Sequence, residues 1–356
     1  MMDFVWVGPI VNPKSVGEFK WISPAANQWQ IQFLDAAIKN KFSCRVLTYL
    51  PLQVWPKGDI QSKYPKNQNV SFVKFEGVNF LNFPKIRELI IAIKLFLIFA
   101  KSPRDLIITY NPLQRHLIFV QLAKFFYSLK WISIIADDLA KGKPDISVFL
   151  SIDYYDRFIG RKLFFEGGIL KRNFKTKMNA KNIIFAGSIS KWTGIIEFVK
   201  MMDSLPLETL DIELHIYGVG AINEIKEIIE RNNSIKYFGY VDEEILELAC
   251  QECLGFVNPR PLEVTNGDNN FPSKLLYYFG FNKPIISTIT KNIPDNYKNF
   301  LIPYSDQSSL LQAIETLHIK GSDKDYHKRL NNFIDENIWE KKVERLMVEI
   351  NHEINL

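Results

Sequence analysis

The sequence contains few cysteines, no long hydrophobic run and no leader-like N-terminus, and each absence excludes a class of protein. Only three of the 356 residues are cysteine, too few for a disulfide framework and typical of a reducing compartment. The most apolar segment, residues 89–100, is shorter than a membrane-spanning helix and contains Lys94. The first residues continue directly into a strand-like run, so we expect no signal peptide and a cytoplasmic location.

Charge is distributed unevenly within a net charge of +5. Residues 1–175 contain 25 Lys and Arg against 13 Asp and Glu, whereas residues 176–356 contain 19 against 26. Such a split indicates that the two halves face different partners. Nucleic acid is not expected, because no basic-aromatic RNA motif or zinc finger is present. Apolar segments accompany the positive charge, which favours an anionic membrane surface or a phosphorylated lipid; a merely basic surface is the alternative.

The order of patterns in the first half predicts an α/β domain. Helical patterns follow several strand-like segments, and the first of these helices has Ser23 as its expected N-cap and Pro24 in its first turn. Buried strands that alternate with helices are typical of a parallel sheet covered on both faces. The strand-like segments are residues 4–9, 42–50, 70–78, 105–111 and 131–138.

The second half repeats this order. The whole chain is therefore expected to form two doubly wound, Rossmann-like domains that face each other across a cleft, at residues 1–175 and 176–335. A basic, polar linker at 167–182 joins them, and a last helix at 336–356 needs another surface to pack on. The second set of strand-like segments is residues 182–189, 212–220, 235–241, 253–261, 283–289 and 300–305.

Several cysteines and histidines are better explained by packing than by chemistry. Cys250 and Cys253 have the spacing of a redox pair, but a helix runs into a strand there, so two buried core thiols are expected. No second cysteine pair could complete a zinc site. His215 alternates within a strand and is expected to be structural. His116, next to Arg115, is expected to face solvent or a membrane.

Three loops at predicted strand ends combine into a candidate anion site. Gly187 and Ser188 follow the first strand of the second half, where small residues permit close approach of a ligand to the backbone. Arg260 follows another strand, and Lys274 opens the next helix, whose free amides Asn270 or Ser273 could cap. A helix N-terminus with a lysine favours phosphate. A solvent-exposed lysine on an ordinary first turn is the alternative.

The segment from Asn182 to Thr290 resembles the GT-B glycosyltransferases, in particular the retaining, metal-independent group 1 type that uses nucleotide-sugar donors. IIFAGSISKWTGIIEFVK and ELHIYGVG resemble the first two strands of its donor domain, and KYFGYVDEEILELACQECLGFVNPRP the run that follows them. FPSKLLYYFGFNKPIIST matches the variant with F-P-S-K before the donor helix. The first half is similar in architecture only, apart from FEGGIL at the junction. The terminal WEKKVERL resembles the helix that crosses back onto the first domain.

The resemblance implies roles for individual residues. Arg260 and Lys274 would neutralise the donor diphosphate and stabilise the leaving nucleoside diphosphate without a metal ion. No cofactor is implied, since the nucleotide-sugar, UDP- or GDP-linked, is a substrate. Contacts with the donor nucleotide and its phosphates would also come from Gly187, Ser188, Tyr240, Ser273 and Tyr277.

The sequence departs from the family pattern in the donor loop and helix. Relatives often carry two glutamates eight positions apart, and here Asn269 and Tyr277 occupy those places. Asp268, Asn269 and Asn270 are the candidates for contacts with the donor sugar. Glu263 or Asp268 could replace a lost carboxylate, although loop acids are usually only solvated.

The first half contributes three carboxylates as candidates. Asp137 and Asp138 end a predicted strand, near the place where relatives often have a His-Asp pair. Such a carboxylate could accept a proton from the acceptor hydroxyl; a helix N-cap is the alternative. Glu166 in FEGGIL is a candidate on the acceptor side, because the two glycines that follow predict a tight turn.

We therefore expect a glycosyltransferase that moves a sugar from a nucleoside-diphosphate donor to a glycan acceptor, lipid-linked, in surface polysaccharide assembly. The protein would be cytoplasmic and peripheral to the inner face of the membrane. The alternative is a non-catalytic GT-B subunit that binds a partner transferase, which the missing glutamates favour and Arg260 and Lys274 oppose. A nicotinamide-dependent enzyme is disfavoured, because no G-x-G-x-x-G turn follows the first strand.

Overall fold

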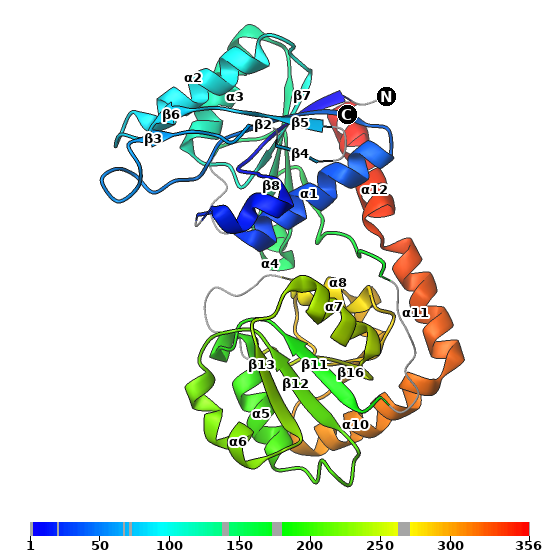
Figure 1. Ribbon diagram of the computed structural model, residues 1–356. Coiled ribbons are helices and arrows are strands. Elements are labelled where there is room, and N and C mark those ends of the chain that lie inside the picture. The colour runs from blue at the N-terminus through cyan, green and yellow to red at the C-terminus, as the bar shows by residue number, and fades with distance from the viewer. Residues whose placement is uncertain are drawn as a thin grey trace. The chain divides into compact units, whose positions relative to one another are not determined.

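The chain forms two compact units, of residues 1–168 with 339–356 and of residues 169–338 (Figure 1). The computed structural model describes residues 3–19, 21–66, 68–70, 73–136, 142–172, 180–262 and 271–355. The predicted boundary at residue 175 lies outside these residues. Each unit is built on a largely parallel sheet with helices, so the predicted α/β class with two Rossmann-like sheets is confirmed.

In the sheet of the first unit, later strands are added on both sides of the first strand. The order is β10-β9-β8-β7-β1-β2-β5-β4, parallel except for the pairing of β4 with β5. A short antiparallel pair, β3 (Gln61–Ser62) and β6 (Phe80–Leu81), is separate from it. The order reverses between β1 and β7, and such a switch point leaves room for a ligand at the carboxyl ends of the strands. The strands are β1 (Asp3–Val7), β2 (Ser43–Thr48), β4 (Asn69–Val70), β5 (Val73–Gly77), β7 (Leu106–Tyr110), β8 (Lys130–Ile135), β9 (Ile146–Phe149) and β10 (Lys162–Phe164).

Side chains of β1 alternate between two hydrophobic cores, as the two-residue period of a strand requires. Phe4 and Trp6 belong to the cluster that includes residues of α1 and α12. Val5 and Val7 belong to the cluster that includes α2 and α3. All four are fully buried, which explains why β1 reads as a continuous apolar run. The helices are η1 (Pro13–Glu18), α1 (Pro24–Lys39), α2 (Arg87–Phe99), α3 (Gln114–Phe126), α4 (Ile152–Arg157) and α12 (Trp339–Asn355).

The second unit repeats the same topology. Its sheet is parallel, in the order β13-β12-β11-β14-β15-β16, and the order reverses between β11 and β14. The strands are β11 (Asn182–Ala186), β12 (Glu213–Tyr217), β13 (Ile235–Gly239), β14 (Gly255–Asn258), β15 (Ile285–Ser287) and β16 (Leu301–Pro303). The helices are η2 (Lys191–Thr193), α5 (Ile195–Asp203), η3 (Ile222–Glu224), α6 (Lys226–Arg231), α7 (Glu243–Glu252), α8 (Lys274–Phe279), α9 (Asp295–Lys298), α10 (Gln307–Ser322) and α11 (Lys324–Glu336).

Local predictions from the sequence can be compared with these elements. Ser23 caps α1 as expected, its Oγ accepting from the Ala26 amide at 3.4 Å, and Pro24 opens the helix. Cys250 and Cys253 are buried free thiols, as predicted, and burial raises the pKa of Cys253 to about 12. No helix in the described ranges is long and apolar enough to cross a membrane.

The last helix is anchored in the first unit by a buried ion pair. Val343 and Met347 of α12 lie in the hydrophobic cluster shared with α1. The Lys342 ammonium lies 2.8 Å from the carboxylate of Glu166, which is only 4% exposed. A charge so deeply buried needs its partner, because desolvation costs several kcal/mol.

Replacing the cation of this pair tests the anchor. Lys342→Met is expected to lower the free energy of unfolding of the first unit by about 3 kcal/mol, since it leaves the Glu166 carboxylate buried without its ammonium. The double variant Glu166→Gln with Lys342→Met should recover most of that loss. Urea unfolding curves measure both, and a Lys342→Met variant as stable as the wild type would contradict this assignment.

Candidate functional site

The strand order of the second unit places two predicted site residues on either side of its switch point. Gly187 follows β11 and Arg260 lies two residues beyond β14, and these two strands are neighbours. The loop after β11 touches the loop after β14. Gly194 packs so closely on the Pro259 carbonyl that a side chain at position 194 would overlap it. The Arg260 carbonyl also accepts a hydrogen bond from Thr288 Oγ1 at 2.6 Å. The backbone of Arg260 is therefore held from both neighbouring strands.

Helix α8 carries Lys274 to the same place. Tyr278, one turn further along α8, accepts a hydrogen bond from the Ala186 amide through its hydroxyl at 3.0 Å. Its ring stacks on Phe256 of β14 at 4.5 Å. These contacts bind α8 to both strands of the switch point. Because residues four apart share a helix face, Lys274 then lies over the end of β11, with Nζ 4.2 Å from the Phe185 ring centroid.

The lysine amine fills the space that a side chain at position 187 would need. Gly187 has a φ of 148°, and a methyl group there would overlap the Lys274 Nζ. The positive φ favours glycine, and any side chain here would displace the lysine amine from its place. Gly218, at the end of β12, is in the same situation, since its side chain would meet the Gly187 carbonyl. At the ends of these strands, the backbone of Gly187 therefore lies directly against the Lys274 amine.

The Lys274 amine is buried, and none of the ion pairs among the described residues includes it. Its Nζ has no hydrogen-bond partner among the described residues. Burial, and next the positive charge of Arg260, lower the pKa of Lys274 from 10.5 to about 7. Desolvated ammonium groups without a partner are unfavourable, so an anion entering here would be strongly stabilised. Two cations at a switch point form an arrangement suited to phosphate.

The expectation that Ser273 caps free amides of this helix is wrong. Ser273 precedes α8, but its side chain makes no capping hydrogen bond. The amides of Leu275 and Leu276 are already bonded to the carbonyls of Pro272 and Ser273. Helix α8 is also only six residues long, so its dipole is small. The anion site therefore depends on the two cations.

The structure places the other predicted donor contacts in different surroundings. Ser188 is exposed beside Gly187, and its carbonyl accepts from Thr193 Oγ1 at 2.9 Å. Tyr240 follows β13 and is 79% exposed. The Arg172 guanidinium lies 4.8 Å from the centroid of the Tyr277 ring. Tyr277 itself packs against the hydrophobic cluster that contains α8. Roles for these three residues in donor binding remain predictions.

Five predicted site residues lie outside the described residues. They are Asp137, Asp138, Asp268, Asn269 and Asn270. Glu166 is described, and its ion pair with Lys342 gives it a structural partner; a role at an acceptor stays a prediction.

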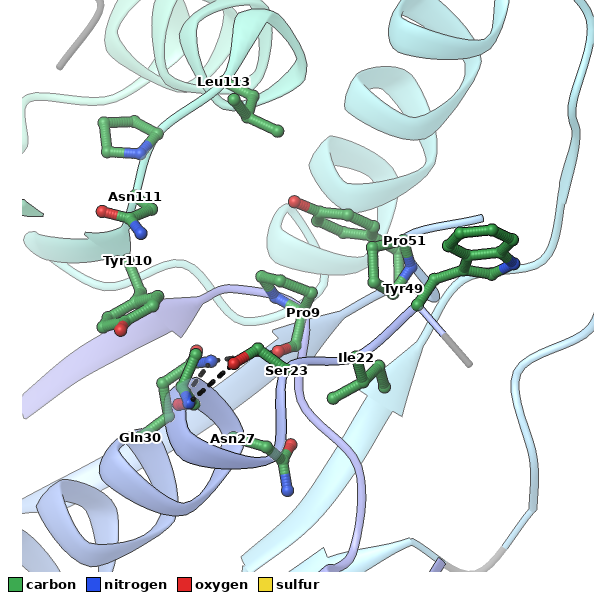
Figure 2. A pocket seen from close by; sticks show the side chains of 13 residues that line it. Pro9, Ile22, Ser23, Asn27, Gln30, Tyr49, Pro51, Tyr110, Asn111 and Leu113 are labelled. Atoms are coloured by element: carbon green, nitrogen blue, oxygen red, sulfur yellow. Dashed lines mark hydrogen bonds between the residues drawn. The ribbon is translucent and has the colours of Figure 1, made fainter. Parts of the chain in front are cut away.

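The first unit has a pocket at its own switch point. Its volume is about 320 Å³, and residues that follow β1, β2 and β7 line it. Figure 2 shows Asn111 on one side and Tyr49 on the other, with Ser23 at the start of α1 between them. None of the described lining residues is charged. A neighbouring pocket of about 440 Å³ shares Trp21 and Pro51.

A buried histidine gives this pocket a hydrogen-bond donor. The Leu113 amide donates to His116 Nδ1 at 2.8 Å, and His116 Nε2 lies 3.0 Å from the Tyr49 hydroxyl. Burial and next Arg115 lower the pKa of His116 to about 3, so the ring is neutral. Its proton is then on Nε2 and is donated to Tyr49. The Tyr49 hydroxyl keeps its own proton for a ligand.

The prediction that His116 faces solvent or a membrane is therefore wrong. His116 is fully buried by its contact with Tyr49. Arg115 Nη2 donates to Glu88 Oε1 at 3.0 Å, and its guanidinium lies 4.7 Å from the Tyr49 ring centroid. The sequence around His116 and Arg115 could not show that their partners are Tyr49, which follows β2, and Glu88 of α2.

The pocket itself was not predicted, although a signal was present. Prolines stand shortly after three strands of the sheet, at Pro9, Pro51 and Pro112. Proline stops a strand and fixes the turn that follows. Three such turns mark the edge where the pocket lies, but only the strand order shows that β1, β2 and β7 are neighbours.

Comparisons with known proteins agree with these features. Residues 180–319 match the model of the family described as glycosyl transferases group 1, which includes Gly187, Arg260 and Lys274. The match covers 140 of the 356 residues. No curated protein matches the sequence.

Solved structures are similar over almost the whole chain. A glycosyltransferase from Rickettsia africae ESF-5 has a TM-score of 0.69 and 14% identity, covering 99% of this chain and 98% of that one. The lipopolysaccharide outer core galactosyltransferase WaaB in its apo form has a TM-score of 0.62 and 12% identity, covering 99% of both chains. The pneumococcal O-GlcNAc transferase GtfA, in complex with UDP and GlcNAc, has 0.60 and 11%, again covering 99% of both.

At these identities the structures establish the GT-B fold. Together with the family match, they indicate a glycosyltransferase of the GT-B type.

Titration of Lys274 tests the anion site directly. We expect its amine to titrate near pH 7 in NMR spectra of ¹³C-labelled lysine, with Lys274→Met identifying the resonance. Sulfate, a dianion throughout this range, should raise that pKa, as should Arg260→Gln. The folded pKa lies below the 10.5 of the free side chain, so the unfolded state binds more protons between the two values. Stability therefore rises with pH across this window. A pKa near 10.5 without anion would contradict the burial of the amine.

Proposed function

We propose that this protein is a glycosyltransferase that moves a sugar from a nucleoside-diphosphate donor, UDP- or GDP-linked, to a glycan acceptor. The observation that carries the proposal is the buried Lys274 ammonium beside Arg260 and Gly187, which has no hydrogen-bond partner in the part of the chain that the structure describes and lies within the segment that matches the group 1 glycosyltransferases. The sugar would be a hexose transferred with retention, as in the group that the sequence resembles. The setting would be surface polysaccharide assembly in the cytoplasm, at the inner face of the membrane.

Electrostatics supply a reason for the chemistry. As the bond between the sugar and the diphosphate breaks, negative charge accumulates on the leaving nucleoside diphosphate. Arg260 offers a fork of donors and Lys274 a point charge, both fixed before the reaction. With its pKa near 7, Lys274 takes up a proton when the diphosphate binds above this pH. Affinity for the nucleotide should therefore fall as the pH rises above about 7.

The uncharged pocket of the first unit suits the acceptor. Trp21 offers an apolar ring to the face of a sugar, and Tyr49 offers a hydrogen to one of its oxygens. No phosphate is expected there, because the lining residues carry no charge. We propose that an uncharged glycosyl unit of a lipid-linked glycan binds this pocket.

A non-catalytic GT-B subunit that binds a partner transferase is the second candidate. The replacement of the family's second glutamate by Tyr277 favours it, since that ring lies in the hydrophobic cluster. A buried amine without a counterion is costly to keep in a protein that binds no anion, and this favours the enzyme.

Thermal unfolding with UDP, GDP, ADP and CMP tests the donor site. One nucleotide at 100 times its dissociation constant should add about 2.7 kcal/mol to the stability of the wild type. Lys274→Met should abolish the response, while Lys226→Met, on the exposed surface of α6, should leave it unchanged.

Turnover then separates the two candidates. Release of nucleoside diphosphate from the matching nucleotide-sugar, lost in Lys274→Met, identifies the enzyme. Binding without any release in the presence of glycan acceptors would favour the non-catalytic subunit. No response to any nucleotide from a well-folded protein would contradict the donor site.

The acceptor pocket is tested with uncharged sugars. Octyl hexosides should bind the wild type in saturation-transfer NMR, whereas hexose phosphates should not compete. Tyr49→Phe should weaken binding about two- to tenfold, the contribution of one hydrogen bond. Tyr326→Phe in the second unit, whose hydroxyl donates to the Phe300 carbonyl, is the matched control. Equal binding by Tyr49→Phe and the control would remove Tyr49 from the pocket's recognition.

A further inference from the structure

Helix α2 is apolar on the side that faces away from the core. Its inner face, including Ile91 and Leu95, is fully buried against the sheet. On another face Leu89, Ile93 and Leu97 follow one another at four-residue spacing and are 41–57% exposed. Lys94 is the exposed charge between them. An apolar row on the outside of a helix whose inner face is already buried commonly marks a surface that meets a protein or a membrane.

Helix α3 extends the same surface. Phe125 and Phe126, at its C-terminal end, are 81% and 61% exposed. Helices α2 and α3 lie side by side (Figure 1), and the ring of Phe126 lies 5.4 Å from that of Phe96 on α2. Exposed phenylalanines of this extent are unusual on a surface that meets only water. We call Leu89, Ile93, Leu97, Phe125 and Phe126 the α2/α3 apolar face.

The charges around this face have one predominant sign. Residues 85–130 contain eight Lys and Arg against two Asp and Glu. Four of the eight cations form ion pairs, Arg87 and Arg115 with Glu88, Arg104 with Asp3 and Lys124 with Asp145. Lys85 and Lys101, at the two ends of α2, are exposed. Exposed apolar side chains flanked by lysines are complementary to a bilayer with anionic headgroups, since the lysines attract the surface and the apolar residues enter it.

We propose that the α2/α3 apolar face docks the first unit onto an anionic lipid bilayer. Leu97, Phe125 and their neighbours would enter the boundary between headgroups and acyl chains, and the flanking lysines would contact the phosphates. This surface is independent of the anion site and the uncharged pocket. The protein would then meet its substrates at a membrane without crossing it.

Co-sedimentation with vesicles tests the proposal. The full chain should bind vesicles of phosphatidylcholine with phosphatidylglycerol, and bind those of phosphatidylcholine alone much more weakly. Leu97→Ser with Phe125→Ser should lower the partition coefficient at least about tenfold. Lys85→Gln with Lys101→Gln should lower it on anionic vesicles and make it less sensitive to salt.

Matched controls separate docking from folding. Ile245→Ser with Leu248→Ser removes two residues of α7 that are 56% and 54% exposed, and should leave vesicle binding unchanged. Every variant should keep the thermal midpoint and the nucleotide response of the wild type, because the altered side chains lie on the surface.

Two results would overturn the proposal. One is absence of binding to anionic vesicles, or binding that the α2/α3 variants leave intact. The other is a concentration-dependent dimer in solution that Leu97→Ser with Phe125→Ser dissociates, which would make the face a contact between two copies. Nucleotide binding is measured separately, so neither result bears on the donor site.

Discussion

The structure depends on one constraint: parallel strands must be joined by right-handed crossovers. In each unit the chain adds strands first on one side of its opening strand and then on the other. The helices of the two series therefore lie on opposite faces, and they diverge where the order reverses. No helix or loop is forced to fill the gap at the carboxyl ends of β1 and β7, or of β11 and β14. The same topology thus creates a binding position in each unit.

A few side chains determine which kind of chemical group each of the two gaps can bind. In the second unit Lys274 and Arg260 make it cationic, and the lack of a side chain at Gly187 leaves room for the amine. In the first unit a neutral histidine orients the Tyr49 hydroxyl, and the lining residues that the structure describes carry no charge. A charged diphosphate and an uncharged sugar ring are the two kinds of group that a sugar transfer must hold. The contrast between the gaps is therefore physically suited to that reaction.

Much of the fold follows from the sequence, because alternation of apolar strands and amphipathic helices is a local property. Gly187, Arg260 and Lys274 could be named for the same reason, as each stands directly at the end of a predicted element. The failures concern contacts between distant segments. Burial of His116 depends on Tyr49, 67 positions away. The pocket depends on which strands are neighbours. The apolar composition of α2 was visible, but not that one of its faces lacks a cover.

The first unit is discontinuous in the sequence, and this has a consequence for how the chain is made. Residues 169–338 are continuous and contain every described strand of their own sheet, so their fold needs no later segment of the chain. The first unit is synthesised earlier but lacks α12, whose residues Val343 and Met347 complete one of its two cores. Contacts between α12 and α1 join residues about 300 positions apart, and such distant closure is slow. The part of the protein that is translated first is therefore the part that finishes folding last.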